Sequence, residues 1–207
     1  MSRYTGPKLR KARRFGETFA MAADRSLAAK FVKNHHKQPP GMHGATRTFK
    51  KHTGYGLQLQ EKQKARTFYH ITEKQLRRCY EAAGRQAGSA SDNLLRILES
   101  RLDNVVYRAG LANSHPQARQ WVNHQQFTLN GHKASIPSML VKAGDVIEFK
   151  GSPKLKDIAA NLAAGNSSVS WLQVDPQRLK ITVTALPTRT EIEVPFTEQL
   201  IIEFYSR

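Results

Sequence analysis

The sequence predicts an α+β protein, in which a mostly helical domain is joined to a module of two helices and a hairpin that extends into a small, mainly antiparallel sheet. Three observations predict this fold. Residues 54–86 place apolar side chains at helical spacing with one break. Residues 92–150 combine two amphipathic helical patterns with a hairpin signal. Residues 169–194 alternate apolar and polar side chains, as half-buried strands do. A chain of 207 residues is long enough for one or two domains with a core.

The charge of the chain is strongly positive and unevenly spread. Thirty-three Lys and Arg against sixteen Asp and Glu give a net charge of +17. Residues 1–50 hold twelve basic and two acidic side chains, whereas residues 151–207 hold six of each. This asymmetry favours a polyanionic partner over a basic surface that is merely solvated. An anionic membrane is the other alternative, but no apolar run approaches the roughly 20 residues of a spanning helix. We therefore predict nucleic acid as the partner and no membrane.

Residues 1–45 are predicted to form a basic N-terminal arm. Its first fourteen residues gather cations without apolar periodicity, so they should order only against phosphates. An organelle-targeting peptide is the alternative, against which Pro7 and the lack of a clean apolar face both count. The pattern around residues 26–32 is modestly helical, and the Pro-Pro-Gly sequence within residues 38–44 predicts a rigid turn.

Three histidines, His35, His36 and His43, lie close together at that turn. A structural zinc site usually has four ligands that include closely spaced cysteines, and the single cysteine of the chain, Cys79, lies in a later helical pattern. We therefore predict no metal and no cofactor. Hydrogen bonding or stacking at an RNA surface is the preferred interpretation of these histidines.

Residues 46–91 are predicted to form a helical domain, which residues 195–207 complete. A break near residues 70–72 separates two helices. Thr72 and Gln75 fit a capping box that starts the second helix.

The stretch 92–150 is predicted to be the core of a second domain that spans residues 92–194. Apolar residues at three- and four-residue spacing predict one helix, which Gly110 ends. They are Leu94, Leu95, Leu98, Leu102, Val105, Val106 and Ala109. Ser114 can cap a second helix, with Pro116 in its first turn.

Asn130-Gly131 lies between extended runs and predicts a hairpin, because both turn positions need positive φ. A strand that ends at Phe149 and a short helix near residues 156–164 follow. Three alternating runs should then extend the sheet. They contain Val169 to Val174, Leu179 to Val183, and Ile192 to Val194.

Motifs in this module resemble the RNA-binding module named after small-subunit ribosomal protein S-four. They are Arg101-Leu102-Asp103, Ala118-Arg119-Gln120, Leu129-Asn130-Gly131, and residues 141–146 (VKAGDV). The flanks SRYTGPKLRKARR, PPGMHG, YGLQLQEKQKAR and EQLIIEFYSR extend the resemblance to nearly the whole chain. The chain is thus similar to the ribosomal protein S-four family. It resembles the zinc-free type, because it lacks the N-terminal cysteine cluster of many relatives. Ser100 and His115 stand where relatives often have arginine, which should weaken local phosphate contacts.

The resemblance implies a structural constituent of the small ribosomal subunit in the cytoplasm. Such a protein is a primary binder of 16S ribosomal RNA and nucleates assembly of the subunit body. The resemblance also implies three further partners: ribosomal protein S-five at an interface that affects translational accuracy, ribosomal protein S-three, and messenger RNA near its entry channel. We expect no homo-oligomer. A free-standing RNA-binding regulator or RNA chaperone is the alternative.

Candidate RNA-binding residues come from the arm, the helical pair and the polar side of the module. They are Arg3, Lys8, Arg10, Lys11, Arg13, Arg14, His43, Arg47, Lys50, Lys51, Lys62, Arg66, Arg101, Arg108, Ser114, Arg119, His124, Asn130 and Lys133.

The sequence lacks the motifs of a phosphate-binding loop, a dinucleotide-binding turn, a serine nucleophile elbow and a zinc protease. The glycines within residues 53–57 follow no predicted strand and are expected to form a loop. Asp103 is the best-placed acid of the module, and an ion pair or a cap on neighbouring backbone suits it better than general-base catalysis. An RNA-modifying enzyme would need a further catalytic domain. We therefore predict that the chain is not an enzyme.

Overall fold

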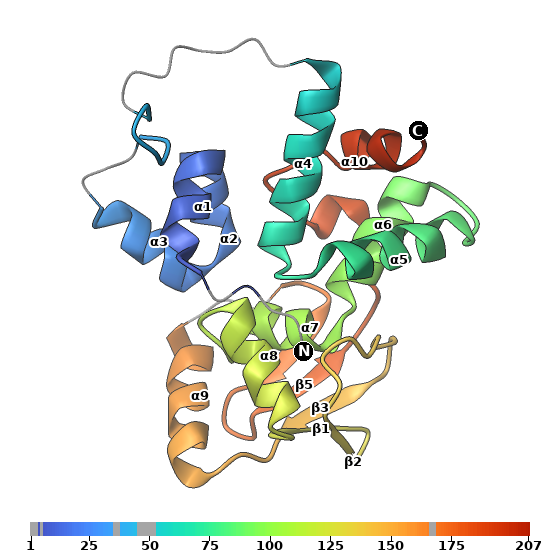
Figure 1. The fold of residues 1–207 in the computed structure, drawn as a ribbon. Helices are drawn as coiled ribbons and strands as arrows, with labels where there is room; N and C mark the ends of the chain where they lie inside the picture. The colour runs from blue at the N-terminus through green and yellow to red at the C-terminus, as the bar shows by residue number, and fades with distance from the viewer. Residues whose placement is uncertain (1–3, 5, 35–37, 45–52, 166–168) are drawn as a thin grey trace. The chain divides into compact units, whose positions relative to one another are not determined.

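The computed structural model describes residue 4 and residues 6–34, 38–44, 53–165 and 169–207. The chain divides into two compact units, residues 1–94 with 193–207 and residues 95–192. The described residues contain ten α-helices and one five-stranded sheet (Figure 1), which confirms the predicted α+β class. The division into an arm, a helical domain and a module stays a prediction.

Three short helices pack on one another at the start of the first unit. They are α1 (Lys8–Phe15), α2 (Glu17–Ala23) and α3 (Arg25–Val32). Ala12, Phe19 and Phe31 are almost completely buried, and the rings of Phe15 and Phe19 pack edge to face with their centres 4.9 Å apart. Gly16 turns the chain between α1 and α2 with a φ of 99°. The prediction that the first fourteen residues lack regular structure is therefore wrong for residues 8–14. The few apolar residues of α1 are enough because α2 and α3 supply the rest of the core.

The Pro-Pro-Gly segment forms the predicted turn. The amide of Gly44 donates to the carbonyl oxygen of Gly41 at 3.0 Å. A Cβ atom at Gly44 would lie 1.8 Å from the carbonyl oxygen of Pro39, so this position has no room for a side chain.

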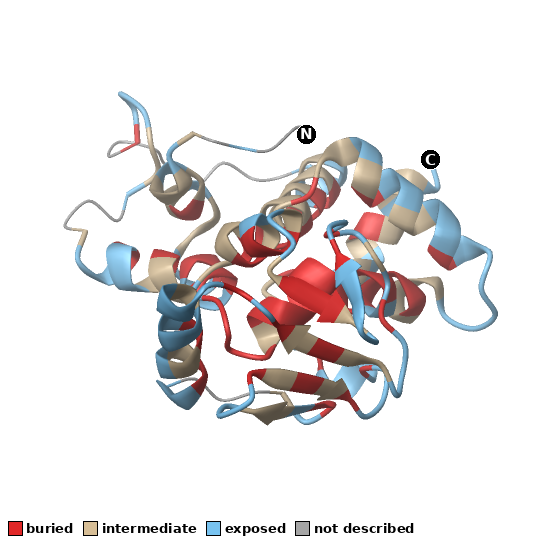
Figure 2. Cartoon of the chain, turned by 90° about the horizontal axis from the view of Figure 1, so that it is seen from below, coloured by how far each residue is buried: buried red, intermediate tan, exposed pale blue. Residues whose placement is uncertain are grey.

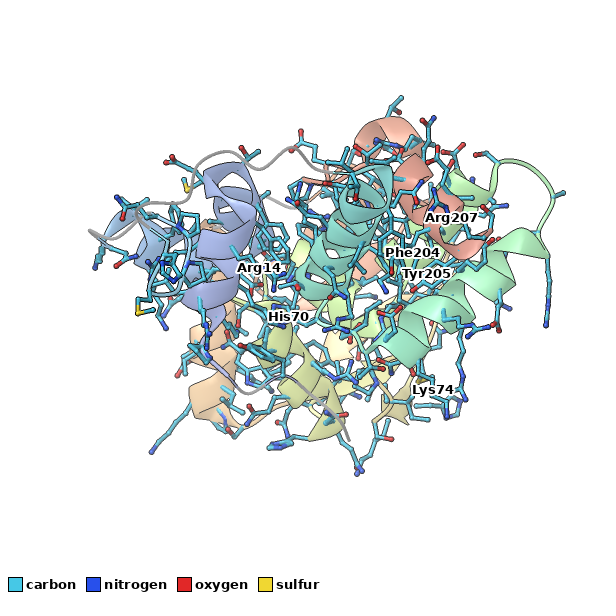
Figure 3. All side chains as sticks on the ribbon, turned by 45° about the horizontal axis from the view of Figure 1, so that its top comes forward. Arg14, His70, Lys74, Phe204, Tyr205 and Arg207 are labelled. Carbon is cyan, nitrogen blue, oxygen red and sulfur yellow. The ribbon has the colours of Figure 1, made fainter. Side chains whose placement is uncertain are left out.

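Two longer helices, α4 (Gly54–Phe68) and α5 (Glu73–Gly84), form the predicted helical pair, and α10 (Glu198–Tyr205) packs along α4. The capping box of Thr72 and Gln75 is present. Thr53 accepts a hydrogen bond from the amide of Gly56 at 3.2 Å, so residues 54–57 are the first turn of α4. The loop that we expected there is wrong, because Thr53 supplies an N-cap. Phe204 and Tyr205 point from α10 toward α4 and α5 (Figure 3).

The second unit contains the end of one helix, three further helices and the sheet. Those three helices and the sheet share one core. The elements are α6 (Ala90–Glu99), which begins in the first unit, α7 (Leu102–Arg108), α8 (His115–Asn123), β1 (Phe127–Leu129), β2 (His132–Ala134), β3 (Val146–Phe149), α9 (Pro153–Gly165), β4 (Leu172–Asp175), β5 (Lys180–Val183) and the 3-10 turn η1 (Arg189–Glu191). Buried side chains of α7, α8 and α9 meet buried side chains of the strands. Figure 2 shows these buried residues along the strands and the helix faces turned toward them, while the outer side of α9 is exposed.

The sheet has the strand order β2-β1-β3-β5-β4, and every neighbouring pair is antiparallel. Asn130 and Gly131 have φ values of 50° and 83°, which confirms the predicted hairpin turn. Ile147 lies opposite Ile181, and both side chains are fully buried. This pair fixes the register of β3 against β5, because a shift by one residue would turn these side chains toward solvent.

The single helix predicted between residues 92 and 110 is interrupted. α6 ends at Glu99, and Arg101 is extended with φ of −68° and ψ of 138°. The backbone groups at the break bond to the loop before β3. Val141 donates to the carbonyl of Ser100 at 2.9 Å, and Leu102 donates to the carbonyl of Met139 at 2.8 Å. The apolar spacing continues across the break, so periodicity alone does not reveal it.

The strand predicted at residues 192–194 is also wrong. Thr188 and Glu191 form a capping box on η1, so the chain turns just before Ile192. Ile192 is 4% exposed and Phe196 is 7% exposed, which explains why the segment looked like a half-buried strand. Ile192 and Phe196 are therefore buried although, among the described residues, this segment does not pair with the sheet.

Candidate nucleic-acid interface

Helix α1 keeps its cations at or near the surface because only Ala12 of its residues is buried. Arg10 and Arg14 are exposed. Three more predicted RNA-binding residues, Lys8, Lys11 and Arg13, are partly exposed. The Nε atom of Arg13 donates to the carbonyl oxygen of Gln38 at 2.8 Å, which ties the helix to the Pro-Pro-Gly turn.

Further predicted RNA-binding residues belong to the arm and to the start of the predicted helical domain. His43 is exposed within the Pro-Pro-Gly turn. Arg3, Arg47, Lys50 and Lys51 lie outside the described residues, as do His35 and His36. Their proposed contacts with RNA stay predictions.

Lys62 of α4 is only 6% exposed and is held inside the helical pair. Its Nζ atom donates to Glu73 at 2.9 Å and lies 4.2 Å from the centre of the Phe204 ring. Tyr205 donates to the same Glu73 oxygen at 2.7 Å. Burial opposes ionisation of Glu73, but the hydrogen bonds from Lys62 and Tyr205 prevail and lower its pKa. Lys62 therefore connects α4, α5 and α10, and its direct contact with RNA stays a prediction.

Two arginines of the module converge on Asp103. Arg101 donates through Nε and Nη2 to both carboxylate oxygens, at 3.1 and 2.9 Å. Arg119 of α8 donates to Asp103 at 2.9 Å. The side chains of Arg101 and Asp103 are only 4% and 8% exposed. The predicted ion-pair role of Asp103 is confirmed. Asp103 lies in the first turn of α7 and Arg119 lies in α8, so their ion pair holds the start of α7 against α8.

A second buried cluster centres on Glu99. Arg108 forms a two-pronged contact with its carboxylate, at 3.0 and 2.7 Å, and Asn104 donates to it at 2.6 Å. His115 lies 3.1 Å from the Asn104 side-chain oxygen, and its ring centre is 3.9 Å from that of Tyr107. His115, one of the two departures from the family pattern, thus occupies a buried position at 4% exposure.

The hairpin end of the module presents polar groups to solvent. Asn130 donates to Asp145 at 2.9 Å and accepts from the amide of Val146 at 2.9 Å, which joins the turn to the loop before β3. Lys133 and His124 are exposed. Ser114 is the N-cap residue of α8, but its side chain makes no capping bond.

The candidate RNA-binding residues predicted from the sequence do not include a row of cations on α5. Lys74, Arg78 and Arg85 are exposed and recur at spacings of four and seven residues, which places them on one side of the helix. Glu81 shares that side and pairs with the neighbouring Arg77 at 3.2 Å. The spacing of these cations in a predicted helix is the sequence signal that marks them.

The structure brings three predicted residues of the first unit together. Lys8, Lys11 and Arg66 line one cavity. Burial lowers the pKa of Lys11, and the charge of Arg66 lowers it further. Burial likewise lowers the pKa of Lys8, although Asp24 partly opposes the effect. Burial and the charge of Arg66 thus disfavour the ammonium form of Lys11, which an anionic ligand would favour.

This set of exposed cations suits the backbone of a nucleic acid, because Lys and Arg neutralise phosphates and release counterions. Within the described residues, no helix is long and apolar enough to cross a membrane.

Comparisons with known proteins cover the chain from end to end. Residues 3–99 match the family described as "Ribosomal protein S4/S9 N-terminal domain", and residues 100–147 match the S4 domain. A "Small ribosomal subunit protein uS4" from Mycobacterium sp. (strain KMS) is 50% identical over 210 aligned positions, which cover 100% of both chains. The uS4 protein of Desulfitobacterium hafniense (strain DSM 10664 / DCB-2) is 46% identical over 211 positions, with the same full coverage. The protein named uS4A of Symbiobacterium thermophilum is also 46% identical over 211 positions and the whole of both chains.

Proposed function

The chain belongs to the ribosomal protein S4 (uS4) family, the S-four family whose motifs it carries, and from that premise we propose that it is an RNA-binding constituent of the small ribosomal subunit in the cytoplasm. The single observation that carries this proposal is the 46–50% identity with small-subunit proteins over the full length of the chain. The protein is structural and has no enzymatic activity of its own. Its net charge of +17 fits a partner with a phosphate backbone.

The cations of the described residues fall into two groups, which differ in exposure and in whether a carboxylate binds them. Exposed residues of α1, the hairpin and α5 are positioned to meet phosphates. Arg101, Arg108 and Arg119, which are buried or partly buried, instead stabilise the packing of α6, α7 and α8, because each is bonded to a carboxylate of this module. RNA folds are recognised largely through backbone and shape, for which such a rigid platform is suited.

We further propose 16S ribosomal RNA as the primary ligand, with the protein nucleating assembly of the subunit body. Ribosomal proteins S-five and S-three are proposed neighbours, the first at an interface that affects translational accuracy. Messenger RNA near its entry channel is a further proposed contact. These finer assignments rest on the resemblance of the sequence motifs.

The test is a titration of the purified chain with naked small-subunit ribosomal RNA at several salt concentrations, with large-subunit ribosomal RNA as competitor. Selective binding that survives the competitor is the expected result. Equal binding to both RNAs would leave only the nonspecific electrostatic attraction. In that case a free-standing regulator or RNA chaperone would replace the assembly protein as the better description.

A further inference from the structure

A cavity of about 270 Å³ in the first unit combines an apolar floor with a basic rim. Phe19 and Ala23 of α2, Leu27 of α3 and Ile71 after α4 line it, and all four are at most 6% exposed. The volume is close to the lower end of the range for ligand pockets, roughly 300–1,000 Å³. It is therefore sized for one small ligand rather than for a folded segment.

The rim supplies three cations from two elements. Lys8 and Lys11 come from α1, and Arg66 comes from the last turn of α4. The side chains of Lys8 and Arg66 are 37% and 32% exposed, so the rim reaches solvent. Among the described residues, Lys11 makes no ion pair, and its Nζ atom lies over the Tyr4 ring at 3.4 Å from the ring centre.

Two carboxylates close to the rim are already engaged. Asp24 lies 3.0 Å from Nε2 of His70, whereas Lys8 is 3.9 Å away and outside hydrogen-bond distance. One oxygen of Glu73 accepts from Lys62 and Tyr205, and its other oxygen is 3.6 Å from Arg66. Figure 3 labels His70, one of the residues that line the cavity. Lys8 and Arg66 thus have only long ion pairs with these carboxylates, at 3.9 and 3.6 Å, and Lys11 has none among the described residues.

Polar and aromatic groups complete the lining. Thr67, His70 and Thr72 place hydrogen-bonding side chains in the cavity wall. Tyr4 also lines the cavity, and its ring is folded back so closely that a Cβ atom at Gly6 would lie 2.7 Å from the Tyr4 hydroxyl oxygen. An apolar floor, a few polar edge partners and an aromatic ring are what an unstacked base of RNA requires.

We propose that this cavity binds a single nucleotide, with the base on the apolar floor and the phosphate between Lys8, Lys11 and Arg66. The inference deepens the proposed function and rests on it for the source of the ligand, an unpaired nucleotide of the bound RNA. A free nucleotide offers the same chemistry, so the experiment has one arm for each source.

The first arm titrates the full chain with 5′-AMP, adenosine or inorganic phosphate and follows binding by calorimetry. Because both halves of the nucleotide contribute, AMP should bind at least about tenfold more tightly than adenosine or phosphate. Lys11→Gln should weaken AMP binding by about tenfold. The matched charge change Lys33→Gln, at an exposed residue outside the cavity, should alter it less than about twofold. Phosphate that bound as tightly as AMP would overturn the nucleotide assignment.

The second arm uses naked small-subunit ribosomal RNA and ultraviolet crosslinking, with the attached nucleotide located by mass spectrometry. Wild-type protein should carry an adduct on the peptide that contains Tyr4. Thr67→Trp, at a partly exposed residue of α4, should fill the cavity and abolish the adduct while the chain still binds RNA.

The outcomes separate the cavity from the general function. RNA binding without any adduct in the cavity, together with no response to AMP, would overturn the nucleotide site and leave the ribosomal function intact. AMP binding that is lost in Lys11→Gln and Thr67→Trp, in a chain that does not bind ribosomal RNA, would support the site with a free nucleotide and contradict the ribosomal function.

Discussion

At the scale of single residues, a neighbouring carboxylate determines the role of a cation. A cation that is paired inside the fold stabilises it, whereas an exposed cation is available to a ligand. Arg101 and Arg10 are both among the RNA-binding residues predicted from the sequence. Arg101 is 3% exposed and gives two hydrogen bonds to Asp103, whereas Arg10 is exposed on α1. An ion pair that is buried becomes costly when one partner is removed, because the other charge is left without compensation.

Asp103→Ala should therefore destabilise the second unit strongly. The change leaves Arg101 buried without its carboxylate and removes the ion pair of Arg119 with Asp103, and we expect a loss of about 3–5 kcal/mol in the free energy of unfolding. Urea unfolding followed by circular dichroism measures it. Asp157→Ala removes an exposed carboxylate of α9 and should stay within about 0.5 kcal/mol of wild type. Equal stability of the two variants would show that the Asp103 cluster does not hold the module together.

The partly buried position of Tyr205 should make the folded protein less stable at high pH. Burial and its hydrogen bond to Glu73 raise the pKa of Tyr205 above the ordinary value of 10.0. A raised pKa in the folded state gives stability that is complete below about pH 10 and is lost as the unfolded tyrosine ionises at higher pH. Tyr205→Phe should thus lose less stability than wild type between about pH 9 and pH 11. The urea midpoint across that range is the measurement. Tyr55→Phe, at a side chain 52% exposed, is the matched control and should follow wild type.

At the scale of secondary structure, the C-terminal helix stabilises α4 through a small apolar contact. Ile201 of α10 is fully buried, and α10 packs along α4. Ile201→Ala should cost about 2–5 kcal/mol, because it removes buried methylene groups and leaves a cavity. Hydrogen exchange of the α4 amides should become faster in this variant. Gln199→Ala, at an exposed position of the same helix, should leave their exchange unchanged. Unchanged exchange in Ile201→Ala would mean that α4 is held by its other contacts.

Sequence patterns predicted the elements whose causes are local. The capping box of Thr72 and the turn at Asn130-Gly131 depend on a few adjacent residues, and both are present. The break at Arg101 depends on hydrogen bonds from the loop before β3, about forty residues later in the chain. The apolar pattern is the same on both sides of it, so no local signal marks the interruption.

The same distinction between local and long-range causes applies to the residues of the candidate interface. Exposure of the α1 cations follows from an apolar-poor helix and could be expected from the sequence. Burial of Lys62 could not, because its partners Glu73 and Tyr205 come from α5 and α10. The cavity bounded by α1 and the end of α4 was also invisible, since its lining residues are scattered from Tyr4 to Glu73.

At the scale of the whole molecule, unequal charge should govern binding. Twelve of the 33 basic residues lie in the first fifty, and the last 57 residues are balanced. A polyanion should therefore be held mainly through counterion release at the N-terminal end, where α1 presents its cations. The C-terminal strands contribute to the core of the second unit rather than to this attraction.

Replacing Arg10 and Arg14 together by alanine tests this distribution. Both are exposed on α1, so the change should weaken binding to small-subunit ribosomal RNA without unfolding the chain. The slope of log K against log salt should fall by roughly 0.7–0.9 for each phosphate contact that is lost. Replacing Lys154 and Lys156 of α9 by alanine removes the same charge elsewhere and is the matched control. A reduced slope in the α1 variant alone would place phosphate contacts on α1. Equal reductions in both variants would instead show that RNA responds to net charge and not to the position of these arginines.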